Sequence, residues 1–322
     1  MKSNASIREI GNLLKNADSI LIFPHLNPDG DALGSATALC LALRKLGKTA
    51  WVLMEDEVPQ YISFIEFGCC TQDKNLIEKP DICICVDCGE ESRFPKRADK
   101  FSEGKLKLCV DHHVTDKGFG DRYYIDESSA AAAQLIYKLI AEMGVEMDKQ
   151  MANALYVGLS TDTGSFQYSN TTAETHMTAA ALHEVGINHV DITVKLYQNI
   201  SRKKIEIQKK VLETMEVFAD GRAAIAYITM EIIEDIGASE DDAEGMVDIL
   251  RNIEGVEIAI FLKEKQDGIK ASMRAKTYGN VDKIAKEFGG GGHIKAAGCT
   301  IKMSMADAVE ALKGEVLNGL GN

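Results

Sequence analysis

The first third of the chain alternates short apolar runs with stretches of helical periodicity. The apolar runs predict strands over residues 19–25, 49–54, 81–87 and 106–113. Between the first two, Leu and Ala recur at helical spacing from Asp31 to Leu46 and stop at Gly47, a typical helix C-cap. A short helix is expected at 61–67. Continuous apolar strands that alternate with helices are typical of a parallel sheet buried on both faces, so this region predicts an α/β fold.

Helical patterns dominate the middle of the chain. Ser128 or Ser129 is expected to cap a helix that Gly144 closes. A second helix is expected over 148–159, before a loop of sequence STDTGS, and a third over 172–185. Residues 187–216 are charged and contain neither Gly nor Pro, so we interpret them as a helical connecting segment.

A second α/β pattern follows this segment. Strands are predicted at 223–229, 256–264 and 268–275, and helices are predicted near 241–252 and from Val281 into a run of glycines. The sequence therefore predicts an α/β protein with an N-terminal parallel-sheet domain and a smaller C-terminal α/β domain. We set the boundaries at 1–186 for the first domain, 187–216 for a helical linker and 217–322 for the second domain.

Composition and charge limit the classes of partner that the protein is expected to bind. The 322 residues are 45% hydrophobic and 26% charged, which is ordinary for a soluble globular protein, and the formal net charge is −13. Proteins that bind long duplex nucleic acid usually carry a basic face, and the sequence has no basic block. No apolar run of about 20 residues predicts a membrane span. Residues 1–20 are typical of an amphipathic helix and not of a secretion signal, so we expect a cytoplasmic protein.

The eight cysteines raise the question of a zinc site. Cys83, Cys85 and Cys88 have the spacing C-x-C-x-x-C, which offers three ligands and no evident fourth. Their run, DICICVDCG, has the apolar pattern of a strand, in which Cys serves as a small buried side chain. We therefore favour a buried strand with reduced thiols over a zinc site.

Candidate chemistry begins at the end of the first predicted strand, where the sequence HLNPDGD places His25, Asp29 and Asp31. The carboxyl edge of a parallel sheet is where α/β folds bind ligands. An ordinary Pro-Asp-Gly turn with an Asp helix cap would give the same residues, so this motif alone leaves the choice open.

Three further positions repeat the pattern. Asp87 and the run Asp111, His112, His113 follow two other apolar strands, and Asp162 lies in the STDTGS loop after a helix. Acids and histidines at several ends of one sheet are hard to explain as separate turns. Carboxylates with a few imidazoles suit Mn²⁺ or Mg²⁺ better than structural Zn²⁺, because these cations prefer oxygen ligands.

These motifs, in this order, resemble the DHH phosphoesterase family, and among its members the chain is most similar to the stand-alone nanoRNase and pAp phosphatase type. The resemblance implies two divalent cations, Mn²⁺ first and Mg²⁺ as the alternative, bridged by Asp87. It implies one ligand set of His25, Asp29 and Asp87, and a second of Asp31, Asp87, His112 and Asp162. It assigns catalytic roles to three further residues. Asp111 would orient an imidazole, and His113 would contact the scissile phosphate. Asn27 would help to orient the phosphate or the metal site.

The end of the chain resembles the DHH-associated domain, through Arg274 and through GGGGHIKAAG at 289–298. Four glycines let backbone N–H groups approach an anion. A flexible linker is the alternative, but the ordered run of glycines, His293, Lys295 and an apolar strand disfavours it. The resemblance implies that the substrate is bound in the cleft between the domains by Arg274, Gly290, Gly291, Gly292, His293 and Lys295.

The implied activity is hydrolysis of short oligoribonucleotides to mononucleotides and dephosphorylation of pAp. A phosphodiesterase for c-di-AMP or pApA would use the same residues, and a catalytically inactive nucleotide-binding module is a further alternative. An inorganic pyrophosphatase is disfavoured, since pyrophosphate has no base or sugar for Arg274 and the glycine loop to recognise. The expected partner is a short oligonucleotide or small nucleotide and not long duplex, and the resemblance is compatible with a homodimer.

Overall fold

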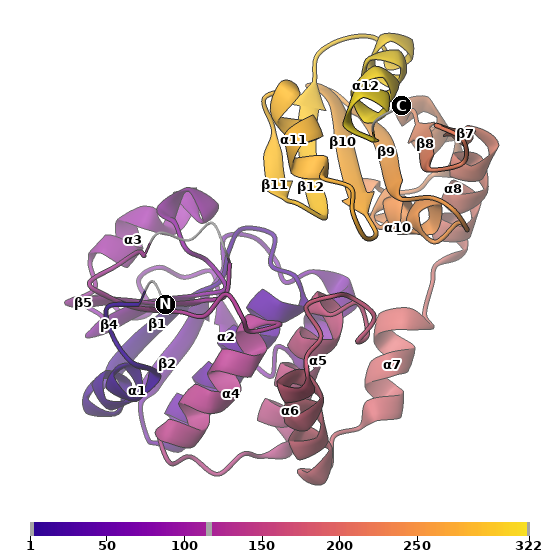
Figure 1. Cartoon of the computed structure of the whole chain (residues 1–322). Coiled ribbons are helices and arrows are strands. Elements are labelled where there is room, and N and C mark those ends of the chain that lie inside the picture. Colours follow the sequence, from indigo (N-terminus) through magenta and orange to yellow (C-terminus); the bar gives the residue numbers. More distant parts are fainter. Residues whose placement is uncertain (1–2, 114–117, 321–322) are drawn as a thin grey trace. The chain divides into compact units, whose positions relative to one another are not determined.

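A computed structural model describes residues 3–113 and 118–320 of the chain. The chain forms two compact units, residues 1–199 and 200–322 (Figure 1). Each is built around its own six-stranded sheet. None of the helices in the described ranges is long and apolar enough to cross a membrane.

The sheet of the first unit is parallel throughout, in the order β3-β2-β1-β4-β5-β6. Its strands are β1 (Ser19–Phe23), β2 (Thr49–Leu53), β3 (Cys70–Thr71), β4 (Ile82–Val86), β5 (Leu106–Asp111) and β6 (Arg122–Ile125). The chain steps outward from β1 to β2 on one side and then returns to β4 on the other. The point between β1 and β4, where the strand order reverses, is the usual ligand position in such sheets.

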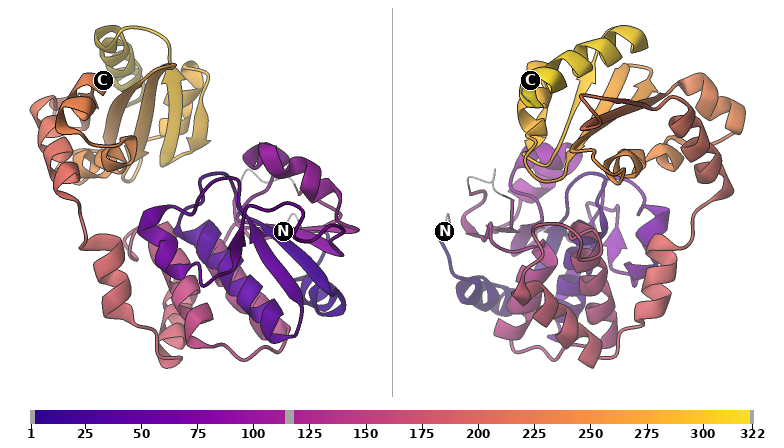
Figure 2. Two further views of the ribbon diagram at one scale, coloured as in Figure 1. Left: turned by 180° about the vertical axis from the view of Figure 1, so that it is seen from behind. Right: turned by 45° about the vertical axis from the view of Figure 1, so that its right-hand side comes forward.

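Helices lie on both faces of this sheet (Figures 1 and 2). The helices of the unit are α1 (Ile7–Asn16), α2 (Gly30–Lys45), α3 (Ala98–Ser102), α4 (Ala132–Glu142), α5 (Lys149–Asp162), α6 (Ala173–Glu184) and α7 (His189–Tyr197). Short 3₁₀ turns occur at Gln60–Ile65, Glu91–Arg93 and Pro95–Arg97. One core packs α1, α2, α4 and α5 on the sheet, and the other face packs against a cluster around Phe94 and Phe101.

Close packing of α2 against α5 depends on glycine. A Cβ atom at Gly34 would lie 2.3 Å from the carbonyl oxygen of Ala154, and one at Gly30 would lie 2.5 Å from the Thr161 hydroxyl. A Cβ at Gly158 would lie 2.9 Å from Asp31 Oδ1. These glycines therefore let the start of α2 and the end of α5 approach each other at the carboxyl edge of the sheet.

The second unit has a mixed sheet in the order β11-β12-β10-β9-β8-β7, in which only β8 and β9 are parallel. Its strands are β7 (Glu216–Phe218), β8 (Ala223–Ile228), β9 (Ile258–Lys265), β10 (Gly268–Ala275), β11 (Gly291–His293) and β12 (Ala296–Ile301). Its helices are α8 (Arg202–Glu213), α9 (Met230–Ile236), the 3₁₀ turn η4 (Glu240–Ala243), α10 (Met246–Arg251), α11 (Val281–Glu287) and α12 (Met305–Leu320).

The two α/β domains and the parallel N-terminal sheet confirm the predicted fold class. Four short strands, β3, β6, β7 and β11, were not predicted. The helix expected at 61–67 is a 3₁₀ turn, and the one expected near 241–252 is interrupted by Gly245, which has a φ of 82°. The segment 187–216 holds two separate helices, α7 and α8, and the units divide between them at residues 199 and 200.

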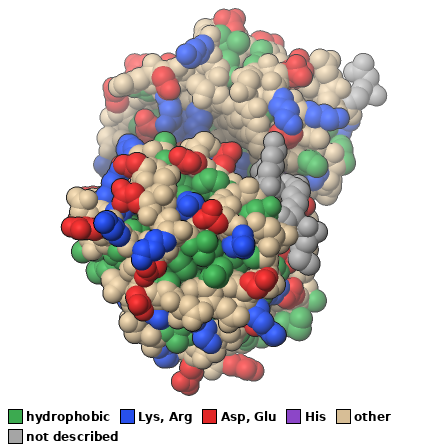
Figure 3. Space-filling view, turned by 90° about the vertical axis from the view of Figure 1, so that its left-hand side faces the viewer, with side chains coloured by type: hydrophobic (Ala, Val, Ile, Leu, Met, Phe, Trp, Pro, Cys, Tyr) green, Lys and Arg blue, Asp and Glu red, His purple; other side chains and the backbone are tan. Residues whose placement is uncertain are grey.

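Two local predictions have clear outcomes. The helix expected after Ser128 or Ser129 begins at Ala132, and its N-cap is Ala131, which makes no side-chain cap; the serine caps were therefore wrong. Cys83 and Cys85 are buried on β4, as the apolar pattern predicted, and all eight cysteines are free thiols. On the face of the molecule drawn in Figure 3, acidic and basic side chains are interspersed without a single basic block.

Candidate metal centre and active site

The loop after β1 brings His25 and Asp29 to the carboxyl edge of the sheet. His25 is buried, and its Nε2 lies 4.0 Å from Asp29 Oδ1. Asp29 is the N-cap of α2, where its Oδ1 accepts hydrogen bonds from the N–H groups of Asp31 and Ala32 at 3.0 Å each. Asn27, between them, is exposed and adopts a left-handed φ of 51°, which Asn tolerates better than most residues. The turn and the cap are thus both real, and they hold the two candidate ligands together.

Asp31 is buried in the first turn of α2 and caps a different helix. Its Oδ2 accepts the N–H of Ala132 at 2.6 Å, and its Oδ1 accepts the N–H of Ala133 at 2.8 Å and the Ser35 hydroxyl at 3.2 Å. The N-terminus of α4 favours a negative charge at this point. Asp31 therefore fixes α4 against α2 while one edge of its carboxylate faces the cluster.

Asp87 directly follows β4 and is 2% exposed. Its φ is 57°, a left-handed conformation that an L-residue adopts only when the surrounding structure imposes it. Asp87 Oδ2 lies 3.7 Å from His25 Nε2, and Oδ1 lies 3.3 Å from His112 Nε2. Within the described part of the chain, buried Oδ1 has no hydrogen-bond donor, which is costly unless another group satisfies it.

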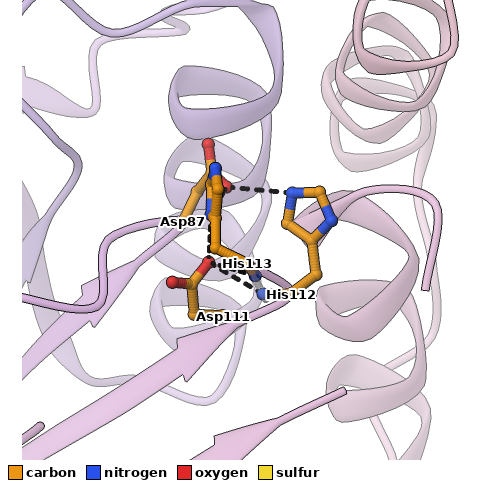
Figure 4. A group of neighbouring side chains, drawn as sticks. All are labelled: Asp87, Asp111, His112 and His113. Carbon is orange, nitrogen blue, oxygen red and sulfur yellow. Dashed lines mark hydrogen bonds and ion pairs between the residues drawn. The ribbon is translucent and has the colours of Figure 1, made fainter. Parts of the chain in front are cut away.

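The end of β5 supplies Asp111, His112 and His113 (Figure 4). Asp111 is fully buried, and its Oδ1 accepts the N–H of His112 at 2.7 Å and lies 2.7 Å from His113 Nδ1. The carboxylate therefore fixes the turn and the ring of His113 at once. His112 Nε2 also lies 3.7 Å from Asp31 Oδ2 and 3.6 Å from Asp162 Oδ2.

Asp162 is the last residue of α5, and not part of a loop after it as predicted. The helix continues three residues further than the sequence pattern indicated, through Ser160 and Thr161. Asn170 Nδ2 donates to the carbonyl oxygen of Asp162 at 3.0 Å and to that of Ala130 at 2.9 Å. This amide ties the end of α5 to the segment that precedes α4.

The potential ligand atoms fall into overlapping groups, in each of which all atoms lie within 4.8 Å of one another. One group contains His25, Asp29 and Asp87, and another contains Asp31, His112 and Asp162. Asp87 lies close to His112 as well, so it stands between the two groups. The first group has the members of the first implied ligand set, and the second group has those of the second set except Asp87. Asp87 falls instead in a third group, with Asp111, His112 and His113.

The histidine rings are oriented as metal ligands usually are. His25 Nδ1 lies 2.8 Å from the carbonyl oxygen of Leu26, and His112 Nδ1 lies 3.2 Å from that of Ser129. A ring that donates its Nδ1–H to a carbonyl presents the lone pair of Nε2, and in both residues Nε2 faces the carboxylates. The donor set and the unsatisfied Asp87 oxygen therefore fit divalent cations.

Electrostatics at the cluster favour an added positive charge. Burial and the charge of Asp31 raise the pKa of Asp87 well above its ordinary value, and the same causes raise the pKa of Asp162 to about 7. Burial opposes protonation of His113, but Asp111 and Asp87 raise its pKa to about 9. Buried like-charged carboxylates resist ionisation together, and a divalent cation relieves that repulsion.

In the second unit, Arg274 and His293 lie in one row across the sheet. Arg274 on β10 pairs with Ala296 on β12, and Ala296 pairs with His293 on β11. Directly opposed residues project to the same face, so the two basic side chains flank the small Ala296. Lys295 Nζ donates to the carbonyl oxygens of Thr277 and Gly279.

The glycine loop is bound within its own unit. The N–H groups of Gly289, Gly290 and Gly292 donate to the Lys286 carbonyl, the Ala285 carbonyl and Asp282 Oδ1. A Cβ atom at Gly290 would lie 2.2 Å from the Gly298 carbonyl oxygen. Close packing against β12 thus accounts for glycine here, and these three N–H groups are already engaged.

The sequence reasoning did not identify the groups that hold the candidate ligands in place. The carbonyls of Leu26 and Ser129 orient two imidazoles, and a backbone carbonyl leaves no trace in residue type. Asn170 had a weak signal, because an Asn shortly after the STDTGS motif is able to bridge loops. Arg97 had none; its buried guanidinium donates to the carbonyls of Pro24 and Leu53 at the ends of β1 and β2.

Comparison with known proteins agrees with this fold. Residues 19–159 match the DHH family, N-terminal domain, and residues 220–318 match the DHHA1 domain. The chain therefore belongs to the DHH family, which confirms the resemblance noted in the sequence. It is 33% identical to the bifunctional oligoribonuclease and PAP phosphatase NrnA of Thermus thermophilus, over 92% of this chain and 88% of that protein. The protein of the same name from Bacillus subtilis is 25% identical, over 88% and 90%.

Solved structures share the fold. An exopolyphosphatase-related protein from Bacteroides fragilis superposes with a TM-score of 0.88 at 28% identity, covering 96% of this chain and 94% of that chain. RecJ from Thermus thermophilus, crystallised with Mn²⁺, has a TM-score of 0.54 at 13% identity, over 96% of this chain and 54% of RecJ. The second likeness shows a common fold alone.

Proposed function

We propose that this protein hydrolyses short oligoribonucleotides to mononucleotides and removes a phosphate from pAp. The observation that carries the proposal is the pair of ligand groups that meet at Asp87, at the carboxyl edge of the parallel sheet. Support for the substrate class comes from the relatives at 33% and 25% identity, which are named for both activities. The reaction is hydrolysis of a phosphoester bond.

We further propose that two divalent cations, Mn²⁺ first and Mg²⁺ as the alternative, bind at these groups. One would be held by His25, Asp29 and Asp87, and the other by Asp31, Asp87, His112 and Asp162. Oxygen-rich sites with two imidazoles suit these ions. When bound, such ions lower the pKa of water and neutralise charge on the phosphoryl group.

His113 and Asn27 have proposed roles next to the metal ligands. Asp111 holds His113 through Nδ1, and His113 would contact the scissile phosphate and protonate the leaving oxygen. Against the effect of burial, Asp111 and Asp87 raise the pKa of His113 in the metal-free protein. Asn27, exposed in the loop after β1, would orient the phosphate through its amide.

The second unit is proposed to bind the nucleotide. Arg274 and His293, in one row on the sheet, would contact a phosphate, and Arg suits bidentate phosphate binding. Gly290, Gly291 and Gly292 would shape the surface beside them, and Lys295 would stabilise the loop at 277–279. We also propose that the protein acts in the cytoplasm, where its eight free thiols would stay reduced.

The test compares five substrates in parallel with Mn²⁺ or Mg²⁺: pApA, a pentaribonucleotide, pAp, c-di-AMP and pyrophosphate. We expect release of mononucleotides from the first two and of phosphate from pAp, and loss of all three in Asp87→Asn. A strong preference for c-di-AMP would replace the proposed substrate class with cyclic dinucleotides. No Asp87-dependent hydrolysis of any substrate would overturn the enzymatic proposal in favour of a nucleotide-binding module.

A further inference from the structure

One face of the second sheet is covered by helices of its own unit only in part. Strands β8 and β9 are buried on both faces, since α11 and α12 pack on one face and α8, α9 and α10 on the other (Figures 1 and 2). The core on the latter face takes strand side chains only from β8 and β9. Strands β10 and β12 alternate instead between buried and more exposed positions.

The strand register places the exposed positions in three parallel rows. The end rows are Arg274, Ala296 and His293 on one side, and Lys270 and Thr300 on the other. The middle row consists of Ser272, Gly298 and Gly291. Two basic positions therefore stand at the ends of a floor of small side chains. Four residues along a strand separate Arg274 from Lys270 by about 13 Å.

The positive charges of Lys270 and Arg274 on this face are only partly neutralised by the acidic residues beside them. Glu244 lies 2.6 Å from the buried Lys263 and only 3.5 Å from Lys270 Nζ. In the same way, Asp248 lies 3.1 Å from Arg251 and 4.0 Å from Arg274. Each acid has a closer partner, so each cluster keeps about one net positive charge. The Lys270 side chain is 44% exposed and that of Arg274 is 33% exposed, which leaves both accessible.

We propose that Lys270 and Thr300 form a second phosphate-binding position, which takes an internal phosphate of an oligonucleotide whose end is held at Arg274 and His293. The inference rests on the proposed function. Complementary charge favours a polyanion, and the flat floor of Gly298, Gly291 and Ser272 lets a ribose or base lie against the backbone. The span is too long for the two phosphates of pAp and suits an oligonucleotide. Lys270 would therefore serve one of the two proposed substrates and not the other.

The experiment measures kinetics of Lys270→Ala with a pentaribonucleotide and with pAp at several salt concentrations. We expect KM for the pentamer to rise about 3- to 10-fold, with kcat unchanged and pAp kinetics unaffected. The slope of log(kcat/KM) against log salt for the pentamer should become shallower by about 0.7, because one phosphate contact is lost. Lys270→Arg should restore the slope.

The matched control is Lys283→Ala, which removes an exposed lysine from α11 on the covered side of the sheet. It should leave both substrates and the salt slope unchanged. Equal effects of Lys270→Ala on pAp and the pentamer, or an effect no larger than that of Lys283→Ala, would overturn the proposal.

Calorimetric binding of the pentamer to Asp87→Asn, with and without Lys270→Ala, separates this proposal from the proposed function. If the protein hydrolyses neither substrate but Lys270→Ala still weakens pentamer binding, the second phosphate position stands and the enzymatic proposal fails. If binding is unchanged, Lys270 has no role in holding the oligonucleotide, and the face is free for another partner.

Discussion

The carboxyl edge of the first sheet uses charged residues differently from the open face of the second sheet, which is the partly covered face that carries Lys270 and Arg274. At the edge, Asp31, Asp87 and Asp111 are buried. Asp31 and Asp111 accept backbone N–H groups, and Asp87 lies 3.3 Å from the His112 imidazole. On the open face, Arg274 and Lys270 are partly exposed and keep loose contacts at 4.0 and 3.5 Å. The edge holds each charge in one geometry, whereas the face offers charges that a ligand can displace from their partners.

This difference follows from what each region is proposed to do. A metal centre requires ligand atoms fixed to within a fraction of an ångström, so the fold imposes left-handed backbone at Asn27 and Asp87 and buries their neighbours. A face that takes oligonucleotides of several lengths needs only positive charge and a flat floor. Substitutions at the edge should therefore cause large losses of turnover, whereas substitutions on the open face should cause smaller, graded losses of substrate binding.

The largest effect is expected for Asp87→Asn, which should lower turnover at least about 10⁴-fold, or ~5.5 kcal/mol, because Asp87 belongs to one ligand group and lies 3.3 Å from His112 of the other. In EDTA its melting temperature should not fall. Burial raises the pKa of Asp87, so the ionised form destabilises the metal-free fold as pH rises, and Asn removes that charge. Thermal melts with EDTA and with Mn²⁺ check this, since only the wild type should gain from the metal.

The control for that variant is Asp81→Asn, at the other end of β4. Asp81 accepts the N–H of Ser19 at 3.0 Å and pairs with Lys105 at 2.6 Å, and these contacts lower its pKa. This variant should lose stability and keep activity. If both variants lost activity alike, the loss would report damage to the strand and not to a metal centre.

Part of the edge was predictable from sequence because parallel strands end on one side of the sheet. Apolar runs that stop at His25, Asp87 and Asp111 therefore implied one site. The predictions that failed concerned features that depend on packing between distant segments. Asp162 lies on a helix because α5 runs on against α2, and Asp31 caps α4 from across the unit, a role no local pattern encodes.

The open face escaped sequence reasoning for a related reason. Alternation along 268–275 predicted β10, but whether its exposed positions meet helices or solvent depends on how far α10 reaches across the sheet. The glycine run was interpreted as an anion loop from composition, and three of its N–H groups serve the fold instead. Strands β3 and β6 are only two and four residues long, too short for a periodic signal.

Arg97→Met tests whether the geometry of the metal centre depends on side chains other than the proposed ligands. Arg97 is buried, donates to the Pro24 carbonyl at 2.9 Å and pairs with the buried Glu55 at 3.3 Å. Removing Arg97 leaves the buried Glu55 carboxylate without its ion-pair partner and should lower the free energy of unfolding by about 3–5 kcal/mol. It should also weaken Mn²⁺ binding in calorimetry, because His25 follows Pro24 directly. Urea unfolding followed by the fluorescence of Trp51, the single tryptophan, measures the stability of this unit.

Lys100→Met is the matched variant, since Lys100 is a buried cation of the same segment whose partner, Glu103, is half exposed. Lys100→Met should lower the free energy of unfolding by less than Arg97→Met does, and it should leave Mn²⁺ affinity unchanged. Equal metal affinities in the two variants would show that the β1 end needs no brace.

Gly34→Ala should have a smaller effect, with a cost of about 1–3 kcal/mol from overpacking. Its Cβ atom would lie 2.3 Å from the Ala154 carbonyl oxygen, so α2 and α5 would have to part. Because these helices carry Asp31 and Asp162, turnover should fall together with stability, as measured by Trp51 fluorescence in urea and by pApA hydrolysis. Loss of stability with full activity would mean that the edge tolerates movement of its helices.

The smallest effect is expected at a glycine of the second unit. Gly314 lies inside α12, and a Cβ atom there would meet no described atom within 4 Å. Ala lowers the conformational entropy of the unfolded chain and favours helix, so Gly314→Ala should stabilise the second unit by about 0.5–1 kcal/mol. Far-UV circular dichroism should report the gain, whereas Trp51, in the first unit, should not. Activity should stay constant, and a parallel shift in Trp51 fluorescence would show that the two units unfold as one.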